Sequence, residues 1–202
     1  MRLLVVFCHP NEDSFGAEIF RTAMTSLAEA GHELRGRDLY RDNFDPVMSP
    51  EERLDYLGSA QKLMERNALY VDDIRWMEGL VVIYPTWYYG MPAMLKGWLD
   101  CVWLPEVTFS VSEEKGARAR FLLWDLKLFV GITTSGSPWW WLKLIGDPGR
   151  RVWTRGLFHP FLTRTKTIWM QLYDMNQRSD AECAAFLGKV DRKLRSLKGS
   201  DI

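Results

Sequence analysis

Three short segments of the chain carry residue types that hold phosphorylated or flat ligands in proteins. The first, residues 9–16 (HPNEDSFG), lies between an apolar run and a helical pattern. The free N–H groups and positive dipole end of a helix bind phosphate, and both the Ser14 hydroxyl and His9 can face the same group. A capped turn without a ligand has the same composition, and the segment has neither a GxGxxG pattern nor a P-loop lysine. Residues 9–16 are therefore a candidate phosphate site.

The second segment, residues 84–92 (YPTWYYGMP), places three consecutive aromatic residues between two prolines. Aromatic side chains in a rigid loop can stack on a flat ring, while backbone N–H groups hydrogen-bond its heteroatoms. Trp87, Tyr88 and Tyr89 could instead pack in the core or against a second copy of the chain. The composition favours a ring-binding loop.

The third segment, residues 133–149 (TTSGSPWWWLKLIGDPG), begins with small residues that let a backbone approach a ligand. The tryptophans at 139–141 then form either a pocket wall or a surface for a partner or membrane interface. Arg150 and Arg151 follow; they could bind a cofactor phosphate or belong to a solvent-exposed face. By itself this segment does not decide between these alternatives.

Composition limits the class of protein. The 202 residues carry 26 basic and 26 acidic side chains, so the net charge of zero disfavours a nucleic-acid partner. Cys8, Cys101 and Cys183 are far apart without metal-ligand spacing, which predicts neither disulfides nor a metal site. There is no signal-peptide pattern and no apolar run of about 18 to 20 residues. We expect one globular domain over 1–202, located in the cytoplasm.

Strand and helix patterns alternate along the chain, which predicts an α/β protein. Apolar runs predict strands over residues 3–8, 79–84 and 126–134, with Gly131 weakening the last of these. Residues 33–39 alternate weakly and are expected to form the second strand, and residues 165–173 the fifth. Helices are expected after Ser14, near Pro50, after Pro92 and after the capping box at Ser179. Five parallel strands with helices on both faces suit the order 2-1-3-4-5, in which ligands bind at the carboxyl ends of the strands. The three segments would then converge.

These segments, together with the continuation LKGWLD after residue 94, resemble the NAD(P)H:quinone oxidoreductase family, which includes DT-diaphorase and shorter bacterial relatives. The resemblance covers most of the chain. It implies a flavodoxin-like, doubly wound sheet that binds FAD or FMN and receives electrons from NAD(P)H. It also implies a homodimer whose active sites use both subunits.

The resemblance carries site residues over segment by segment. The first segment would hold the flavin phosphates, the second would lie along the isoalloxazine ring, and the third would complete the ring site. The implied cofactor-binding residues are His9, Ser14, Phe15, Gly16, Pro85, Thr86, Trp87, Tyr88, Tyr89, Thr133, Thr134, Ser135 and Gly136. The implied substrate pocket contains Tyr89, Phe109 and Trp139, and Tyr88 or Tyr89 is expected to donate a hydrogen bond to the acceptor oxygen.

The implied activity is two-electron hydride reduction of quinones or similar small acceptors by a ping-pong mechanism. Trp139 and Ile145 stand where DT-diaphorase has a tyrosine and a histidine assigned to charge relay, so that relay is not expected. Gly16 replaces an asparagine, and the final helix lacks an adenine-side arginine, which leaves FAD and FMN both open, with family membership favouring FAD. The alternative function is a flavin-binding regulatory subunit of a potassium-efflux transporter, with the tryptophan-rich segment as its partner surface. That association is not favoured.

Overall fold

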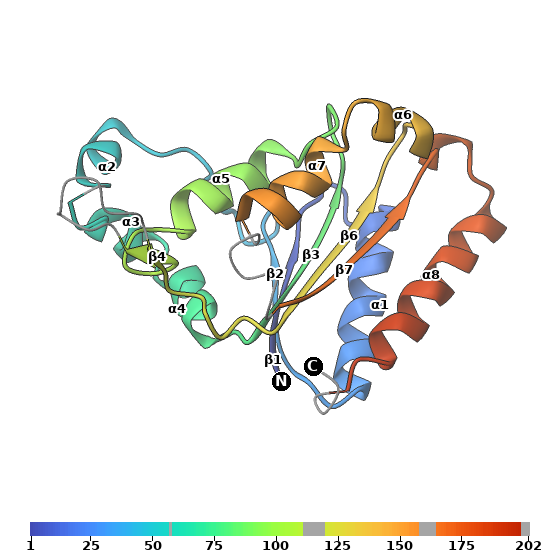
Figure 1. Ribbon diagram of the computed structural model, residues 1–202, viewed down its shortest axis with the longest axis horizontal. Coiled ribbons are helices and arrows are strands. Elements are labelled where there is room, and N and C mark those ends of the chain that lie inside the picture. The colour runs from blue at the N-terminus through green and yellow to red at the C-terminus, as the bar shows by residue number, and fades with distance from the viewer. Residues whose placement is uncertain (57, 111–119, 158–164, 199–202) are drawn as a thin grey trace.

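A computed structural model describes residues 1–56, 58–110, 120–157 and 165–198. Its centre is a five-stranded parallel sheet in the order β2-β1-β3-β6-β7 (Figure 1). The strands are β1 (Arg2–Phe7), β2 (Glu33–Asp38), β3 (Gly79–Pro85), β6 (Leu128–Thr134) and β7 (Lys166–Leu172). The predicted order 2-1-3-4-5 is confirmed, because β4 (Phe109–Ser110) and β5 (Arg120–Phe121) form a separate antiparallel pair.

Helices cover both faces of the sheet, as Figure 1 shows. One face packs on α1 (Phe15–Glu29) and α8 (Asp180–Arg195), and the other on a layer that includes α4 (Ala68–Trp76) and α5 (Ala93–Val102). Successive residues of a strand point to opposite faces. Leu3 and Val5 therefore enter the first core while Leu4 and Val6 enter the second. Burial on both faces explains why β1 and β3 appear in the sequence as unbroken apolar runs.

Local capping sets where the two long helices begin. The Ser14 hydroxyl accepts the Ala17 N–H at 3.2 Å, and Ser179 forms a reciprocal capping box with Glu182. Both starts agree with the prediction from sequence. The expected weakness at Gly131 has a structural reason: a Cβ there would lie 2.2 Å from the Trp169 ring of β7, so the glycine makes room for that ring.

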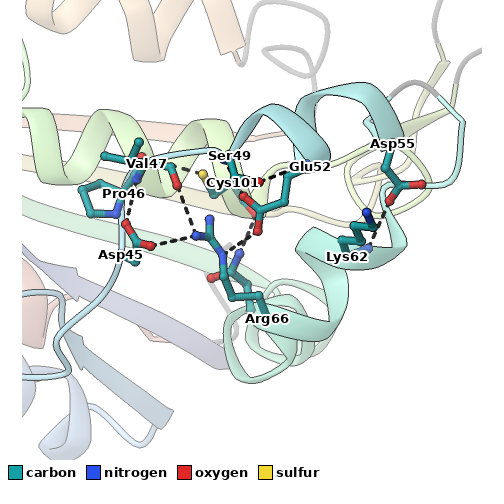
Figure 2. Close-up of polar contacts among 10 residues, drawn as sticks. Asp45, Pro46, Val47, Ser49, Glu52, Asp55, Lys62, Arg66 and Cys101 are labelled. Atoms are coloured by element: carbon teal, nitrogen blue, oxygen red, sulfur yellow. Dashed lines mark hydrogen bonds and ion pairs between the residues drawn. The ribbon is translucent and has the colours of Figure 1, made fainter.

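The connection from β2 to β3 contains three helices, α2 (Pro50–Asp55), α3 (Gln61–Arg66) and α4. Only α2 was expected from the sequence. Figure 2 shows how Arg66 holds this connection together: its guanidinium donates to Asp45 at 2.9 Å and to the Val47 carbonyl at 3.1 Å, and it pairs with Glu52 at 3.0 Å. Gly97 of α5 then lets the connection pack closely, since a Cβ there would be 2.2 Å from Pro46.

Short helical segments follow β6 and β7 at the carboxyl edge of the sheet. They are α6 (Trp139–Leu144), α7 (Pro148–Arg151), a π-helical turn (Val152–Leu157) and a 3₁₀ turn (Met175–Gln177). The buried Trp153 anchors this region by donating its indole N–H to the Tyr84 hydroxyl at 2.9 Å. Within the described ranges, no helix is both long enough and apolar enough to cross a bilayer.

The opposite edge of the sheet gives a pH prediction. Glu78 accepts the Arg2 backbone N–H and the Lys127 ammonium, both at 2.9 Å, and these contacts lower its pKa to about 2. A carboxyl whose pKa is lowered by folding contributes stability above its unfolded pKa and loses it as the pH falls toward the folded value. We therefore expect Glu78→Gln to be less stable than the parent at pH 7, with the difference shrinking between about pH 4.5 and pH 2. Urea unfolding across this range checks it, and a constant difference would contradict it.

Candidate functional site

A cleft of about 460 Å³ opens at the carboxyl ends of β1, β3, β6 and β7. The segments that follow these four strands form its walls. Its lining residues are His9, Ser14, Phe15, Gly16, Pro85, Thr86, Trp87, Thr134, Gly136, Met175 and Asn176. The three sequence segments therefore converge, as the predicted topology required.

The first segment offers hydrogen-bond donors at one end of the cleft. The His9 ring is fixed by the Asn11 backbone N–H, 3.0 Å from Nδ1, and Asn11 in turn accepts the Asp13 N–H at 2.9 Å. At the start of α1, the N–H groups of Phe15 and Gly16 hydrogen-bond to no residue that the structure describes. Free N–H groups beside the Ser14 hydroxyl, at a helix start with a positive dipole end, suit a phosphate.

The second segment is held rigidly beside the first. Thr86 makes two hydrogen bonds to the Thr134 carbonyl, from its N–H at 2.8 Å and from its hydroxyl at 3.0 Å. Trp87 and Gly90 then exchange backbone hydrogen bonds at 3.1 and 3.0 Å, and so close a tight turn. The two residues inside this turn, Tyr88 and Tyr89, have φ of 46° and 65°. Bulky residues rarely adopt left-handed backbone conformations, and such strain clusters at functional sites.

The two tyrosines of this turn differ in their surroundings. Tyr88 is fully exposed, whereas the Tyr89 hydroxyl accepts the indole N–H of Trp141 at 3.1 Å. Because Tyr89 uses its oxygen as acceptor there, its own hydroxyl hydrogen remains available to a ligand. Both tyrosines line a smaller hollow of about 260 Å³ with Ser135 and Ser137. This hollow shares Thr86 and Gly136 with the main cleft, so the two adjoin.

Neighbouring residues of the third segment have different positions. Thr134 and Gly136 line the cleft, and Ser135 lines the smaller hollow. Thr133 is buried, lines neither space, and its hydroxyl has no partner in the described part of the chain. Strand alternation explains the difference, since Thr133 and Thr134 point to opposite faces of the sheet. If Thr133 contributes to the flavin ring site that the resemblance implies, it does so indirectly.

Comparison with known proteins agrees with this arrangement. Residues 1–146 match the family model described as the flavodoxin-like fold. The chain belongs to this flavodoxin-like fold family. A Streptococcus mutans crystal structure of the same fold is 31% identical, with a TM-score of 0.82 over 98% of this chain and 100% of that one.

Two further similar proteins carry enzyme names. A solved NAD(P)H:quinone oxidoreductase from Methanothermobacter marburgensis is 27% identical, with a TM-score of 0.75 over 96% of both chains. An uncharacterised NAD(P)H oxidoreductase of Escherichia coli K12 is 35% identical over 50% of this chain and 52% of its own length. The matched region spans about half the length of this and similar curated relatives. The family resemblance inferred from sequence is confirmed.

Met175 and Asn176 were not predicted as site residues of this flavodoxin-like protein. They belong to the 3₁₀ turn after β7, and a Cβ on Gly136 would lie 3.1 Å from the Asn176 amide nitrogen. The sequence did contain a signal for these two residues, because every segment that follows a strand of a parallel sheet begins at the same edge. The expected fifth strand therefore implied a fourth wall of the cleft.

Two residues expected in the substrate pocket line neither space within a single described chain. Phe109 is on β4, on the α2–α4 side of the molecule in Figure 1, and lines neither space. Trp139 is 53% exposed, with the Lys143 ammonium 4.8 Å from its ring centroid, and it also lines neither. Trp141 is the tryptophan of this run that contacts the site, through Tyr89. Within one described chain, Phe109 and Trp139 do not form the pocket.

Nucleophilic cysteine chemistry has no support in this site. Burial raises the pKa of the nearby Cys8 thiol to about 12, which keeps it protonated at neutral pH. Within the described ranges, no three His, Cys, Asp or Glu side chains are arranged to hold a metal ion. The potential donors that the cleft presents are backbone N–H groups, hydroxyls, the His9 ring and the Asn176 amide.

Proposed function

We propose that the protein binds FMN or FAD in the cleft and uses NAD(P)H to reduce quinones or similar small acceptors by two electrons. The observation that carries this proposal is that the cleft and the smaller hollow form one continuous site with two chemically different ends. One end has the free N–H groups of the α1 start, and the other has the aromatic turn at Tyr88 and Tyr89. The relative from Methanothermobacter marburgensis, named as such an enzyme, supports the same activity.

The residues of the two ends have separate tasks. The Ser14 hydroxyl and the N–H groups of Phe15 and Gly16 would bind the phosphate. The backbone N–H groups of Tyr88, Tyr89 and Gly136, which have no acceptor in the described chain, would bind the heteroatoms of the ring. Pro85 and Trp87 also line the cleft. A bound flavin supplies a two-electron carrier, and the protein supplies its position and surroundings.

The smaller hollow is where donor and acceptor would bind. It lies beside Tyr89 and adjoins the cleft through Thr86 and Gly136. One hollow of this size would be occupied by the nicotinamide and the acceptor in turn, so we expect ping-pong kinetics. A homodimer would allow Phe109 and Trp139 of a second copy to complete the walls. Since NAD(P)H is a cytoplasmic metabolite, we propose that the protein acts there.

The two tyrosines give a prediction that separates their roles. Both tyrosines border the hollow, but Tyr89 is held there by Trp141 and keeps a free hydroxyl hydrogen, whereas Tyr88 is fully exposed. We expect Tyr89→Phe to lower kcat for quinone reduction about tenfold, as loss of one hydrogen bond to the acceptor oxygen would. Tyr88→Phe serves as the matched control with little change. Steady-state kinetics measure both, and unchanged rates in the two variants would reject tyrosine as the donor.

The proposed function is tested directly on the purified protein. Heat release followed by chromatography identifies any bound flavin and distinguishes FMN from FAD. Anaerobic addition of NADH or NADPH should then bleach the visible absorption, and added quinone should restore it. A colourless protein that takes up neither flavin on reconstitution would reject the proposal.

A further inference from the structure

A second cleft, strongly basic, lies beside α7 and the π-helical turn. It has a volume of about 410 Å³ and is lined by Lys143, Gly146, Asp147, Arg150, Arg151, Thr154 and Arg155. Three arginines and one lysine against one aspartate give the lining a net charge of +3. The whole chain has 26 basic and 26 acidic residues, so this concentration of charge is local. A cleft lined by one sign of charge concentrates counter-ions.

The four cations of this lining are not paired with carboxylates in the described part of the chain. Within the described ranges, none of them lies within 4.0 Å of an acidic oxygen, whereas arginines elsewhere, such as Arg37 and Arg66, form ion pairs. Asp147 faces the same cleft, and its pKa is raised by burial, with Arg150 and Arg151 opposing that shift. Four like charges that face a single carboxylate repel one another. The arrangement would therefore be stabilised by an anion.

The backbone supports this arrangement. Gly146 has a φ of +87°, and a Cβ there would lie 2.8 Å from a terminal nitrogen of Arg151, so the glycine gives the guanidinium space. The Thr154 hydroxyl donates to the Arg150 carbonyl at 3.0 Å. Local hydrogen bonding and a glycine thus shape the wall that presents the arginines.

The basic cleft lies close to the hollow where NAD(P)H would bind. Gly149 of α7 packs against the aromatic turn, since a Cβ there would be 2.8 Å from the Tyr89 carbonyl oxygen. The next two residues along α7, Arg150 and Arg151, line the basic cleft. One short helix therefore contacts the aromatic turn and also contributes to the basic cleft. A ligand as long as a dinucleotide can contact both.

We propose that the basic cleft binds a phosphate monoester and that its occupant is the 2′-phosphate of NADPH, an inference that rests on the proposed function. Guanidinium groups match phosphate oxygens with two parallel hydrogen bonds. In Rossmann-type dinucleotide enzymes, an acidic residue hydrogen-bonds the ribose 2′-hydroxyl of NADH, and a nearby arginine accommodates the 2′-phosphate of NADPH. Three arginines outweigh Asp147 here, so the protein prefers NADPH.

Equilibrium binding tests the assignment without requiring turnover. Adenosine 2′,5′-bisphosphate and adenosine 5′-monophosphate differ only in the 2′-phosphate. We expect calorimetry to show the bisphosphate binding at least about tenfold more tightly, and Arg150→Gln to remove most of that preference. Arg151→Gln is the second variant, and Arg192→Gln on α8 is the control that removes the same charge elsewhere. Equal binding of the two nucleotides, or equal loss in the control, would overturn the assignment.

Two further measurements distinguish a nucleotide from free phosphate as the ligand, and failure of this inference from failure of the proposed function. If inorganic phosphate displaces the bisphosphate only at much higher concentration, the nucleotide assignment is supported, whereas displacement at equal concentration would overturn it. A protein that is reduced by NADH and shows no preference for the bisphosphate would contradict the NADPH inference alone. A protein that binds the bisphosphate through Arg150 but takes up no flavin would support the phosphate cleft and reject the proposed enzyme.

Discussion

A Ser14→Asp variant is expected to fold normally and to lose its bound flavin. Aspartate caps helices as well as serine does, so the Ala17 N–H at the start of α1 keeps an acceptor. The carboxylate, however, replaces a hydroxyl donor with a negative charge beside the free N–H groups of Phe15 and Gly16. Loss of one hydrogen bond to a phosphate weakens binding by about 1.5–3 kcal/mol, and charge repulsion adds to it. We expect the flavin Kd to rise at least about a hundredfold.

Flavin titration followed by fluorescence, together with the thermal midpoint, measures this effect. Ser14→Thr is the matched control, because threonine retains both the cap and the hydroxyl. It should bind flavin within a few-fold of the parent. If Ser14→Asp binds as tightly as the control, the phosphate does not lie at the start of α1. A variant that unfolds would be identified by its thermal midpoint, and Ser14→Gly, which removes the hydroxyl without adding charge, then gives the answer.

The central elements could be predicted because their causes are local. Strands buried on both faces give unbroken apolar runs, as in β1 and β3, and a serine cap marks a helix start. The short helices α3 and α6 have no such signal. Arg66 at the end of α3 pairs with Asp45 and Glu52, residues far enough along the chain that no local pattern connects them. Tertiary contacts of this kind cannot be read from one sequence.

The candidate site was predictable in outline but not in detail. Topology brings every loop after a parallel strand to one edge, which placed the three segments together. Which tryptophan contacts the site depends on how α6 packs, and Trp141 rather than Trp139 meets Tyr89. Tyr88 and Tyr89 adopt left-handed backbone conformations that aromatic residues rarely adopt, so conformational preferences alone would not predict this turn. A departure from local preference of this kind is expected at a functional site.

Strand β2 is also fixed by tertiary contacts that its own sequence does not reveal. Removing these contacts has the largest expected effect on stability. Its sequence alternates weakly, and two of its side chains, Arg35 and Arg37, meet the fully buried Asp73 of α4. The guanidinium nitrogens lie 3.0 and 2.5 Å from the carboxylate oxygens. We expect Asp73→Ala to lower the free energy of unfolding by about 3–5 kcal/mol, since it leaves Arg37 without an ion-pair partner among the described residues and Arg35 with only the exposed Asp72. A typical domain has only about 5–15 kcal/mol in total.

Asp72 is the matched control for this prediction, because it is the neighbouring residue and also pairs with Arg35, at 2.7 Å. Its side chain is 69% exposed, and exposed ion pairs contribute about 0–1 kcal/mol. Urea unfolding of Asp73→Ala and Asp72→Ala should therefore differ by at least about 2 kcal/mol. Equal losses would mean that water reaches Arg35 and Arg37 well enough to replace the carboxylate. The weak alternation of β2 would then reflect an exposed edge strand rather than one fixed by a charge on α4.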